Sequence, residues 1–336
     1  MGKKNLLHFP IFDIISVLND YIRKGETKQS MGHYSTQDIA SQYSQAKGQN
    51  VKLWQSLKRI GDERWFNVSV CSQVIKVRFC PECGRTHTET SFCCRHRLCP
   101  VCAVRKSHKT GRQALEAFEY MEQQGQLEGA SLWLITLTQR NVSSDNLKTE
   151  IDGLLSALIS MRHTQSIRRR LLGSARNIEI TYNRKTRTFH PHVHMIAIIK
   201  DGDDDMYKPL YWRSLWQRLM NLDYEPICDI RHITDTQGAV CEVSKYAIKP
   251  SSIYDLKLSK THMDDVVRIL NDALTNRRLV SYTGIWREAR KLLKQVDVDL
   301  LTLEQDDNSS VCGCGANLME AMLKWDGLVY VPFTTE

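Results

Sequence analysis

The sequence predicts an α+β protein built on a mainly antiparallel sheet. Two observations indicate this class: amphipathic helical segments alternate along the chain with short apolar strands, and two of the strands are joined by a short polar loop. The strands are expected at 132–138, 177–182, 190–199 and 226–233. Asn183–Thr188 is typical of a hairpin loop between the second strand and the third.

The helices are predicted from apolar residues that recur every three or four positions. Leu115, Phe118 and Met121 indicate a helix over 104–124, and a broader apolar face indicates one over 147–161. Pro209 opens a helix that ends at residue 219, and Pro250 stops a short helix over 241–249. Further helices are expected at 264–276 and 285–294.

Composition favours a protein that binds a polyanion. The 336 residues carry 46 Lys and Arg against 38 Asp and Glu, a formal net charge of +8. No run of about 18 apolar residues predicts a membrane span, and the N-terminus does not resemble a signal peptide. Seven of the eleven cysteines fall between Cys71 and Cys102. We therefore expect a cytoplasmic location and metal binding rather than disulfides.

The cysteine spacing predicts a structural zinc site. Cys80 and Cys83 form one C-x2-C pair, Cys99 and Cys102 form another, and fifteen residues separate the two pairs. Two such pairs can place four thiolates around one tetrahedral zinc ion. The ligand set is left open, because four residues inside the loop could replace a ligand or serve a second metal: Cys93, Cys94, His87 and His96.

A basic segment overlaps the cysteine cluster. Residues 95–112 contain six Arg or Lys and no Asp or Glu. Such a segment suits contacts with DNA phosphates, although a solvated helix face beside the zinc would have the same composition. The candidate DNA-binding residues are Arg95, Arg97, Arg105, Lys106, Lys109 and Arg112.

The strand at 190–199 begins with three alternating histidines. His190, His192 and His194 point to one face, because side chains alternate along a strand. Beyond them both faces are apolar, as in a central strand. Adjacent imidazoles at the end of a buried strand indicate metal coordination, since imidazole suits manganese, zinc and similar ions; three inert histidines are the alternative.

The hairpin offers a carboxylate for the same site. If Lys185 and Thr186 form its tip, Glu179 lies opposite His192 on the same face. A slip of one residue would turn Glu179 away. Asn177 opposite His194, and Thr181 opposite His190, are weaker candidates.

The short helix at 241–249 brings together a phenol, a carboxylate and a cation. Glu242, Tyr246 and Lys249 share one face because they are spaced by four and three residues. Tyrosine has a free pKa of about 10, so attack by it requires a metal-activated electrophile or help in losing its proton. Tyrosine on a helix usually belongs to the core. This helix therefore indicates a catalytic role only in combination with the histidine strand in the same chain.

Together these segments resemble the rolling-circle replication initiators of the HUH endonuclease class, in which U is a hydrophobic residue. His192-Val193-His194 matches that motif, and the strand that ends in Thr136-Leu-Thr138 is similar to the first motif of the class. The segment 242–246 resembles its tyrosine motif, in the version with Glu four residues before a single Tyr. The segment 94–102 resembles the zinc segment of the small initiators of Gram-positive-type plasmids. The resemblance extends from about residue 80 to 293.

This resemblance implies a palm-like antiparallel sheet with a central histidine strand and the tyrosine helix against its metal face. It also implies a mechanism. Mg²⁺ or Mn²⁺, held by His192, His194, Glu179 and His190, polarises the scissile phosphate, and Tyr246 attacks it to form a 5′-phosphotyrosine and free a 3′-OH. Glu242 would activate water for the terminating cleavage, and Lys249 would orient or neutralise the phosphotyrosine.

The implied partners are plasmid origin DNA, as a single strand or a hairpin nick site, and the host helicase and DNA polymerase. The resemblance also suggests the domain organisation. Residues 1–70 form an N-terminal region without an assigned role, 71–125 the zinc-binding basic module and its helix, 126–295 the endonuclease domain, and 296–336 an acidic linker and tail.

Two other functions fit the same residues. A transposase or mobilisation relaxase of the same chemical class can carry a zinc module, but several of these use two tyrosines. Tyr254, eight residues after Tyr246, would not share its helix face cleanly. A zinc-containing DNA-binding regulator with an inactive histidine strand is the non-enzymatic alternative, and a nicking assay separates it from the others.

Overall fold

The computed structural model describes residues 35–82, 86–90, 92–202, 205–234, 236, 240, 253–254, 258–300, 311–312 and 315–333. The chain divides into two compact units. The four-stranded unit draws its described residues from Met1–Gly48, Ser72–Cys93 and Leu303–Glu336. The five-stranded unit draws its own from Gln49–Cys71 and Cys94–Thr302.

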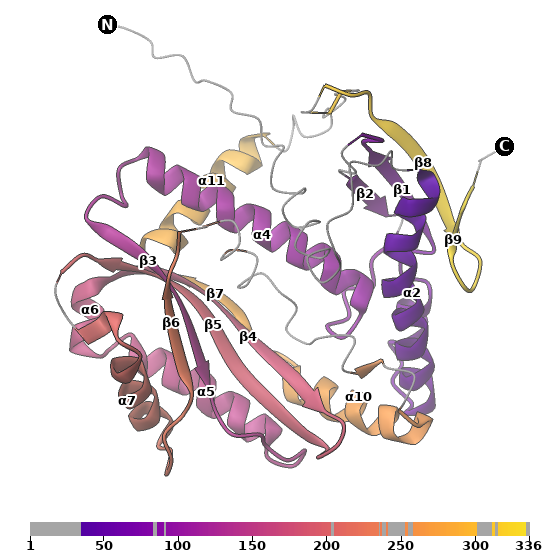
Figure 1. Ribbon diagram of the computed structural model, residues 1–336. Coiled ribbons are helices and arrows are strands. Elements are labelled where there is room, and N and C mark those ends of the chain that lie inside the picture. The colour runs from indigo at the N-terminus through magenta and orange to yellow at the C-terminus, as the bar shows by residue number, and fades with distance from the viewer. Residues whose placement is uncertain are drawn as a thin grey trace, which may run out of the picture. The chain divides into compact units, whose positions relative to one another are not determined.

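The five-stranded unit contains an antiparallel sheet in the order β6-β3-β5-β4-β7 (Figure 1). Its strands are β3 (Ala130–Thr138), β4 (Leu171–Asn183), β5 (Thr188–Lys200), β6 (Cys228–His232) and β7 (Val280–Thr283). The histidine strand, β5, lies at the centre, and its residues from Met195 to Ile199 are buried. The predicted α+β class, the antiparallel sheet and the central histidine strand are confirmed.

The β4–β5 hairpin has the register that the sequence predicts. Glu179 pairs with His192, Asn177 with His194, and Thr181 with His190. On the other side of β5, Thr136 pairs with His194 and Thr138 with His192. The face of the sheet that carries the histidines is called the histidine face below.

Helices cover both faces of this sheet. α4 (Pro100–Gln123) and α11 (Gly284–Leu300) pack against each other, with the rings of Phe118 and Trp286 6.3 Å apart. α11 contacts β4, where Gly173 lies within van der Waals reach of Trp286. Strand alternation from Gly173 to Glu179 puts α11 on the histidine face. α5 (Leu147–Met161) packs against α7 (Pro209–Met220) and α10 (Lys260–Leu274), and Figure 1 shows α5 beneath the sheet, on the side away from α4.

Local sequence explains where these helices begin. Pro100 and Pro209 occupy the first helical position of α4 and α7, where a missing backbone N–H costs nothing. The Ser259 side chain caps α10 by accepting a hydrogen bond from the His262 backbone N–H at 3.2 Å. Gly284, at the start of α11, has a φ of +54° and lies against the carbonyl of Leu172, so a side chain has no room there. Three further short helices are described over their whole length in this unit: α3 (Trp65–Ser69), α6 (Gln165–Arg170) and η2 (Asp205–Tyr207).

The four-stranded unit contains a second antiparallel sheet in the order β2-β1-β8-β9. Its strands are β1 (Val74–Phe79), β2 (Thr86–Thr90), β8 (Met319–Trp325) and β9 (Tyr330–Pro332). β1 alternates half-buried and buried residues, with Ile75, Val77 and Phe79 on its buried side. The long helix α2 (Thr36–Arg59) contributes residues to both units.

Most predicted elements of the five-stranded unit are found within a few residues of their expected ends. The helix expected at 241–249 lies outside the described residues. Among the helices that are described, none combines the length and the apolar character that crossing a bilayer requires.

Candidate metal centres

Glu179, His192 and His194 form the first candidate centre. One carboxylate oxygen of Glu179, Oε2, lies 3.6 Å from Nε2 of His192 and 3.6 Å from Nε2 of His194. The three side chains are 12–15% exposed, so their ligand atoms converge in a largely buried position that remains open to one side.

The two imidazoles are held by hydrogen bonds at their other nitrogens. Nδ1 of His192 lies 3.2 Å from the carbonyl oxygen of His190, and Nδ1 of His194 lies 3.3 Å from the hydroxyl of Thr136. These contacts leave Nε2 of both rings facing the carboxylate of Glu179. Such outer contacts orient histidine ligands in metal sites generally.

The carboxyl group of Glu179 is ionised despite its burial. Burial raises its pKa, but hydrogen bonds and charges from His192 and His194 outweigh that effect and lower the pKa to about 2. One carboxylate and two imidazole nitrogens within 4.8 Å of one another are a donor set that suits Mn²⁺ and related divalent ions. The residues present therefore fit a divalent metal.

His190 lies beside this group rather than in it. Its ring is 5.3 Å from that of His192, and it is not among the three residues whose ligand atoms converge. Burial, followed by the neighbouring His192, lowers the pKa of His190, so this imidazole is neutral at physiological pH.

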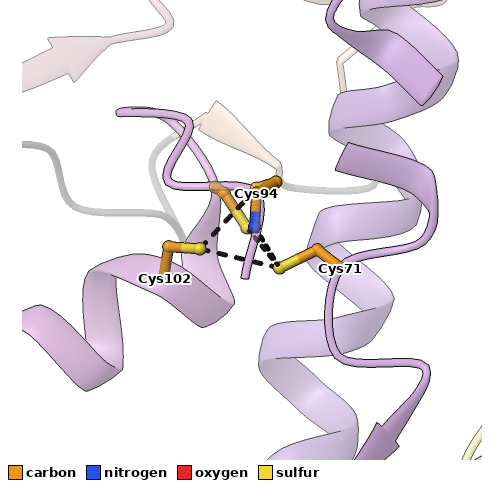
Figure 2. Close-up of side chains that lie close together, drawn as sticks. Cys71, Cys94 and Cys102 are labelled. Atoms are coloured by element: carbon orange, nitrogen blue, oxygen red, sulfur yellow. Dashed lines mark hydrogen bonds between the residues drawn. The ribbon is translucent and has the colours of Figure 1, made fainter. Parts of the chain in front are cut away.

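Four cysteines of the five-stranded unit form the second candidate centre. Cys71 follows α3, Cys94 and Cys99 lie in the loop before α4, and Cys102 is in the first turn of α4. Their sulfur atoms lie within 4.8 Å of one another. Figure 2 shows the side chains of Cys71, Cys94 and Cys102 directed toward one another.

The sulfur spacing fits a tetrahedral zinc ion. Sγ of Cys102 is 3.6 Å from Sγ of Cys71 and 3.6 Å from Sγ of Cys94, and the distance from Cys71 to Cys99 is 3.9 Å. Thiolates bound to zinc at about 2.3 Å in a tetrahedron are about 3.8 Å apart. The group thus has the donor type, the number and the spacing of a structural zinc site.

Polar contacts support the same centre. Hydrogen bonds from Cys102, Cys94 and Cys99 hold the pKa of the Cys71 thiol far below its usual value. The fully buried amide of Asn50 donates hydrogen bonds to Sγ of Cys99 at 3.3 Å and to the carbonyl of Val68 at 3.1 Å. Asn50 therefore ties α2 to the cysteine loop.

The structure brings together three of the predicted zinc ligands, Cys94, Cys99 and Cys102, with Cys71, which the spacing argument did not select. Cys80 lies at the end of β1 in the four-stranded unit and is not a member of the group. Cys83 lies outside the described residues. Cys71 has no C-x2-C partner, so only its inclusion in the run of seven cysteines could have indicated it.

The residues of the predicted tyrosine motif, Glu242, Tyr246 and Lys249, also lie outside the described residues. Tyr254, which follows them, is buried, and its hydroxyl donates a hydrogen bond to the carbonyl of Leu98 at 2.8 Å. Its own carbonyl accepts one from Lys52 at 2.9 Å. Tyr254 is thus fixed to the cysteine loop and to α2.

The predicted DNA-binding residues lie in the cysteine loop and on α4. Arg95, Arg97, Lys106 and Lys109 are exposed, and Arg105 is half-buried. The side chain of Arg112 lies outside the described residues. Burial of parts of their side chains lowers the pKa values of Arg97 and Lys106, and the charge of Arg97 adds to the effect on Lys106.

The known proteins that are similar to this chain are described as rep or replication proteins. The family model described as "Replication protein" matches residues 85–328. A "Protein rep" of Bacillus amyloliquefaciens is 30% identical over 339 residues, covering 92% of this chain and 95% of the relative. The "Protein rep" of Lentilactobacillus hilgardii is 28% identical, with 84% and 92% covered, and that of Streptococcus pneumoniae is 29% identical, with 68% and 73% covered. No solved structure matches the chain.

Proposed function

Because this chain belongs to the replication protein family, we propose that it initiates rolling-circle replication of a plasmid by nicking one strand of the origin DNA. The observation that carries this proposal is the convergence of Glu179, His192 and His194 on the histidine face. Two histidines at the end of the central strand, with a carboxylate on the neighbouring strand β4, would form the metal-binding half of such a nuclease.

Glu179, His192 and His194 would hold Mg²⁺ or Mn²⁺. When bound, the metal supplies positive charge that polarises the scissile phosphate and stabilises its transition state. The protein's own part is to keep the three ligands in place, through the contacts of Nδ1 of His192 and His194 with the His190 carbonyl and with Thr136.

Tyr246 is proposed as the nucleophile on the strength of its sequence motif. Its phenol oxygen attacks the phosphorus atom, the bond from phosphorus to the 3′ oxygen breaks, and the phenol proton is lost as the 3′-OH is formed. The products are a 5′-phosphotyrosine and a free 3′-OH that a host polymerase can extend. The bond energy stays in the phosphotyrosine linkage, so rejoining needs no ATP. Lys249, three residues later in the sequence, would neutralise the linked phosphate.

The burial of Tyr254 favours a single nucleophile. Its hydroxyl already donates a hydrogen bond to the carbonyl of Leu98, and burial raises its pKa well above the usual value. Such a phenol is a poor second nucleophile, which counts against the two-tyrosine arrangement of several transposases and relaxases.

The decisive experiment incubates the protein with a single-stranded oligonucleotide from its replicon's origin and Mn²⁺, and then looks for a covalent protein–DNA band. Tyr246→Phe is expected to abolish the band and to leave DNA binding nearly intact, because only the phenol oxygen is lost. Tyr254→Phe is the matched control and is expected to keep the band. A strong band from Tyr246→Phe would assign the nucleophile elsewhere, and no band from the unaltered protein would favour the DNA-binding regulator.

The cysteine centre is proposed to hold structural Zn²⁺. Its ligands fix the loop that precedes α4 and, through Leu98, the position of Tyr254. Origin DNA, the host helicase and the host polymerase are the proposed partners. Cutting confined to the origin of its own replicon would separate a plasmid initiator from a transposase.

A further inference from the structure

Three cavities of the five-stranded unit neighbour one another through shared lining residues, and together we call them the basic groove. The first, of about 340 Å³, borders the cysteine loop, and the third, of about 600 Å³, lies between α4, β7 and α11. Arg97 and Asn276 line both of these cavities. The second, of about 190 Å³, lies beside α6 and shares Arg287 with the third.

The charged residues that line the groove are all basic, although Arg64, Arg277, Arg287 and Lys291 pair with carboxylates that do not line it. Each of the three cavities is lined by several Arg or Lys side chains, and the described residues that line them include no Asp or Glu. Arg162, Arg168 and Arg278 are exposed, and their guanidinium groups have no carboxylate partner among the described residues. A groove of this kind attracts an anion with many charges rather than a neutral ligand.

A buried arginine near Arg162 and Arg278 lacks a counter-charge, although it pairs with Met195 and so points to the face of the sheet opposite the histidine face. Arg176 on β4 is largely buried, and its Nη1 has no hydrogen-bond partner among the described residues. Burial, together with the like charges of Arg162 and Arg278, lowers its pKa to about 10. Burying a cation next to two others is unfavourable, and an anion held between Arg162 and Arg278 would relieve it.

The groove is built to contact phosphates rather than bases. Tyr282 is the one Phe, Tyr or Trp among its described lining residues, and the guanidinium of Arg290 covers its ring at 3.8 Å. Arg290 is also held by a hydrogen bond to Gln113 at 2.8 Å. Base stacking requires an uncovered ring. The groove can therefore recognise DNA through contacts between its cations and phosphate oxygens.

One end of the groove lies close to the metal triad along the sheet. Val280, which lines it, pairs with Asn177 on β4, and Asn177 pairs with His194 on β5. Two strand spacings amount to about 10 Å. This end of the groove is therefore about 10 Å from the metal triad, whereas the cavity beside α6 borders Leu171, which pairs with Ile199 at the other end of β5.

We propose that the basic groove binds the sugar–phosphate backbone of a single DNA strand that flanks the scissile phosphate, with Arg162, Arg168 and Arg278 as phosphate ligands. The proposal rests on the proposed nicking function for its choice of polyanion. A single strand is favoured over a duplex because the anion sites are cavities that border an edge strand, which suits one backbone that can bend into them.

The test measures binding of the full-length Tyr246→Phe protein, which does not cleave, to a fluorescent single strand of about 30 nucleotides, long enough to exceed one site size. The groove variant combines Arg162→Gln, Arg168→Gln and Arg278→Gln. We expect its affinity to fall about tenfold or more at low salt, and the slope of log K against log salt to flatten by about 2, since each lost phosphate contact removes about 0.7.

The control variant removes three exposed charges elsewhere in the same unit, through Lys148→Gln, Lys208→Gln and Arg268→Gln. It is expected to keep both the affinity and most of the slope. Equal losses in the two variants, or an unchanged slope in the groove variant, would overturn the proposal. A loss seen only with a duplex of the same sequence would overturn the assignment to a single strand. This assay needs no cleavage, so it tests the groove even if the protein does not nick DNA.

Discussion

The register of one hairpin determines which side chains meet at the metal triad. Glu179 faces His192 because β4 and β5 pair in that register, and a slip by one residue would replace Glu179 with an apolar neighbour, Ile178 or Ile180. The buried side chains on the opposite face hold this register, because a slip would expose all of them at once. The ligand set is thus a property of the whole hairpin.

Removing one ligand of the triad should abolish most of the cleavage. Glu179→Gln and His194→Ala are each expected to slow metal-dependent nicking by roughly two orders of magnitude, since a lost ligand weakens both metal binding and phosphate polarisation. His190→Ala is the matched control, because His190 is on the same strand and face but outside the converging group. Initial rates against Mn²⁺ concentration measure the effect. An equal loss in His190→Ala would place that residue among the ligands.

Glu242 provides the sharpest test of the initiator assignment. If Glu242 takes a proton from water during the terminating cleavage, Glu242→Ala should still nick and form the adduct but fail to terminate. Its usual pKa of about 4.3 keeps it ionised at neutral pH, as a base must be. Gel analysis of plasmid replication should then reveal multimeric single strands. If only unit-length circles appear, Glu242 has no role in termination. It would then only form a surface ion pair with Lys249, an interaction that contributes less than about 1 kcal/mol.

The sequence predicted the three residues of the triad, because strand alternation and a short loop leave few ways for them to face one another. It did not predict Cys71. The C-x2-C rule favours pairs that are close in sequence, whereas Cys71 joins the centre through the turn after α3 and through hydrogen bonds such as that from the Cys94 N–H to its sulfur at 3.4 Å. That contact depends on tertiary structure.

At the scale of elements, we expect the cysteine loop and the start of α4 to depend on the second centre. Cys71→Ser is expected to lower the zinc content of the purified protein from about one per chain and to reduce its melting temperature, because thiolate sites supply folding energy through the metal. Cys80→Ser is the matched control, since both thiols are fully buried, and it should keep its zinc. Elemental analysis distinguishes the two. Zinc lost only from Cys80→Ser would restore the original pairing of Cys80 with Cys99 and Cys102.

Elements with a strong local pattern were predicted well. The observed α5 has the expected bounds, 147–161. The four-residue strand β7 and the helix α2 were not predicted. β7 is too short for alternation to stand out, and α2 is largely polar over its first half. Strands β1 and β8 owe their pairing to residues far apart in the chain, which local periodicity cannot detect.

At the scale of the whole molecule, two metals with different chemistry are expected to respond differently to chelation. Dilute EDTA should remove the ion held by Glu179, His192 and His194 and stop nicking, and added Mn²⁺ should restore it. Zinc in the four-cysteine centre should remain bound, because thiolates hold it far more tightly. Parallel measurements of activity and zinc content check this prediction. Full activity in excess EDTA would contradict the metal triad.

The net charge of +8 does not show how unevenly the charges are distributed over the surface. Positive side chains gather along the basic groove, whose described lining residues include no Asp or Glu, while Asp62, Asp152 and Glu288 pair with some of these cations from outside the lining. Overall charge favoured a polyanionic partner in the sequence analysis. Where that partner would lie follows from the fold.

The second sheet has a consequence for how the protein is made. Its strand β1 needs β8, and the entire five-stranded sheet is encoded between them. A ribosome adding about 5–20 residues per second delivers β8 roughly 10–50 s after β1. During that interval one edge of the β1–β2 ribbon has no partner strand. The nascent chain can assemble its five-stranded sheet before this edge is paired, and so it must pass through a stage at which a chaperone or another nascent chain can reach the exposed strand.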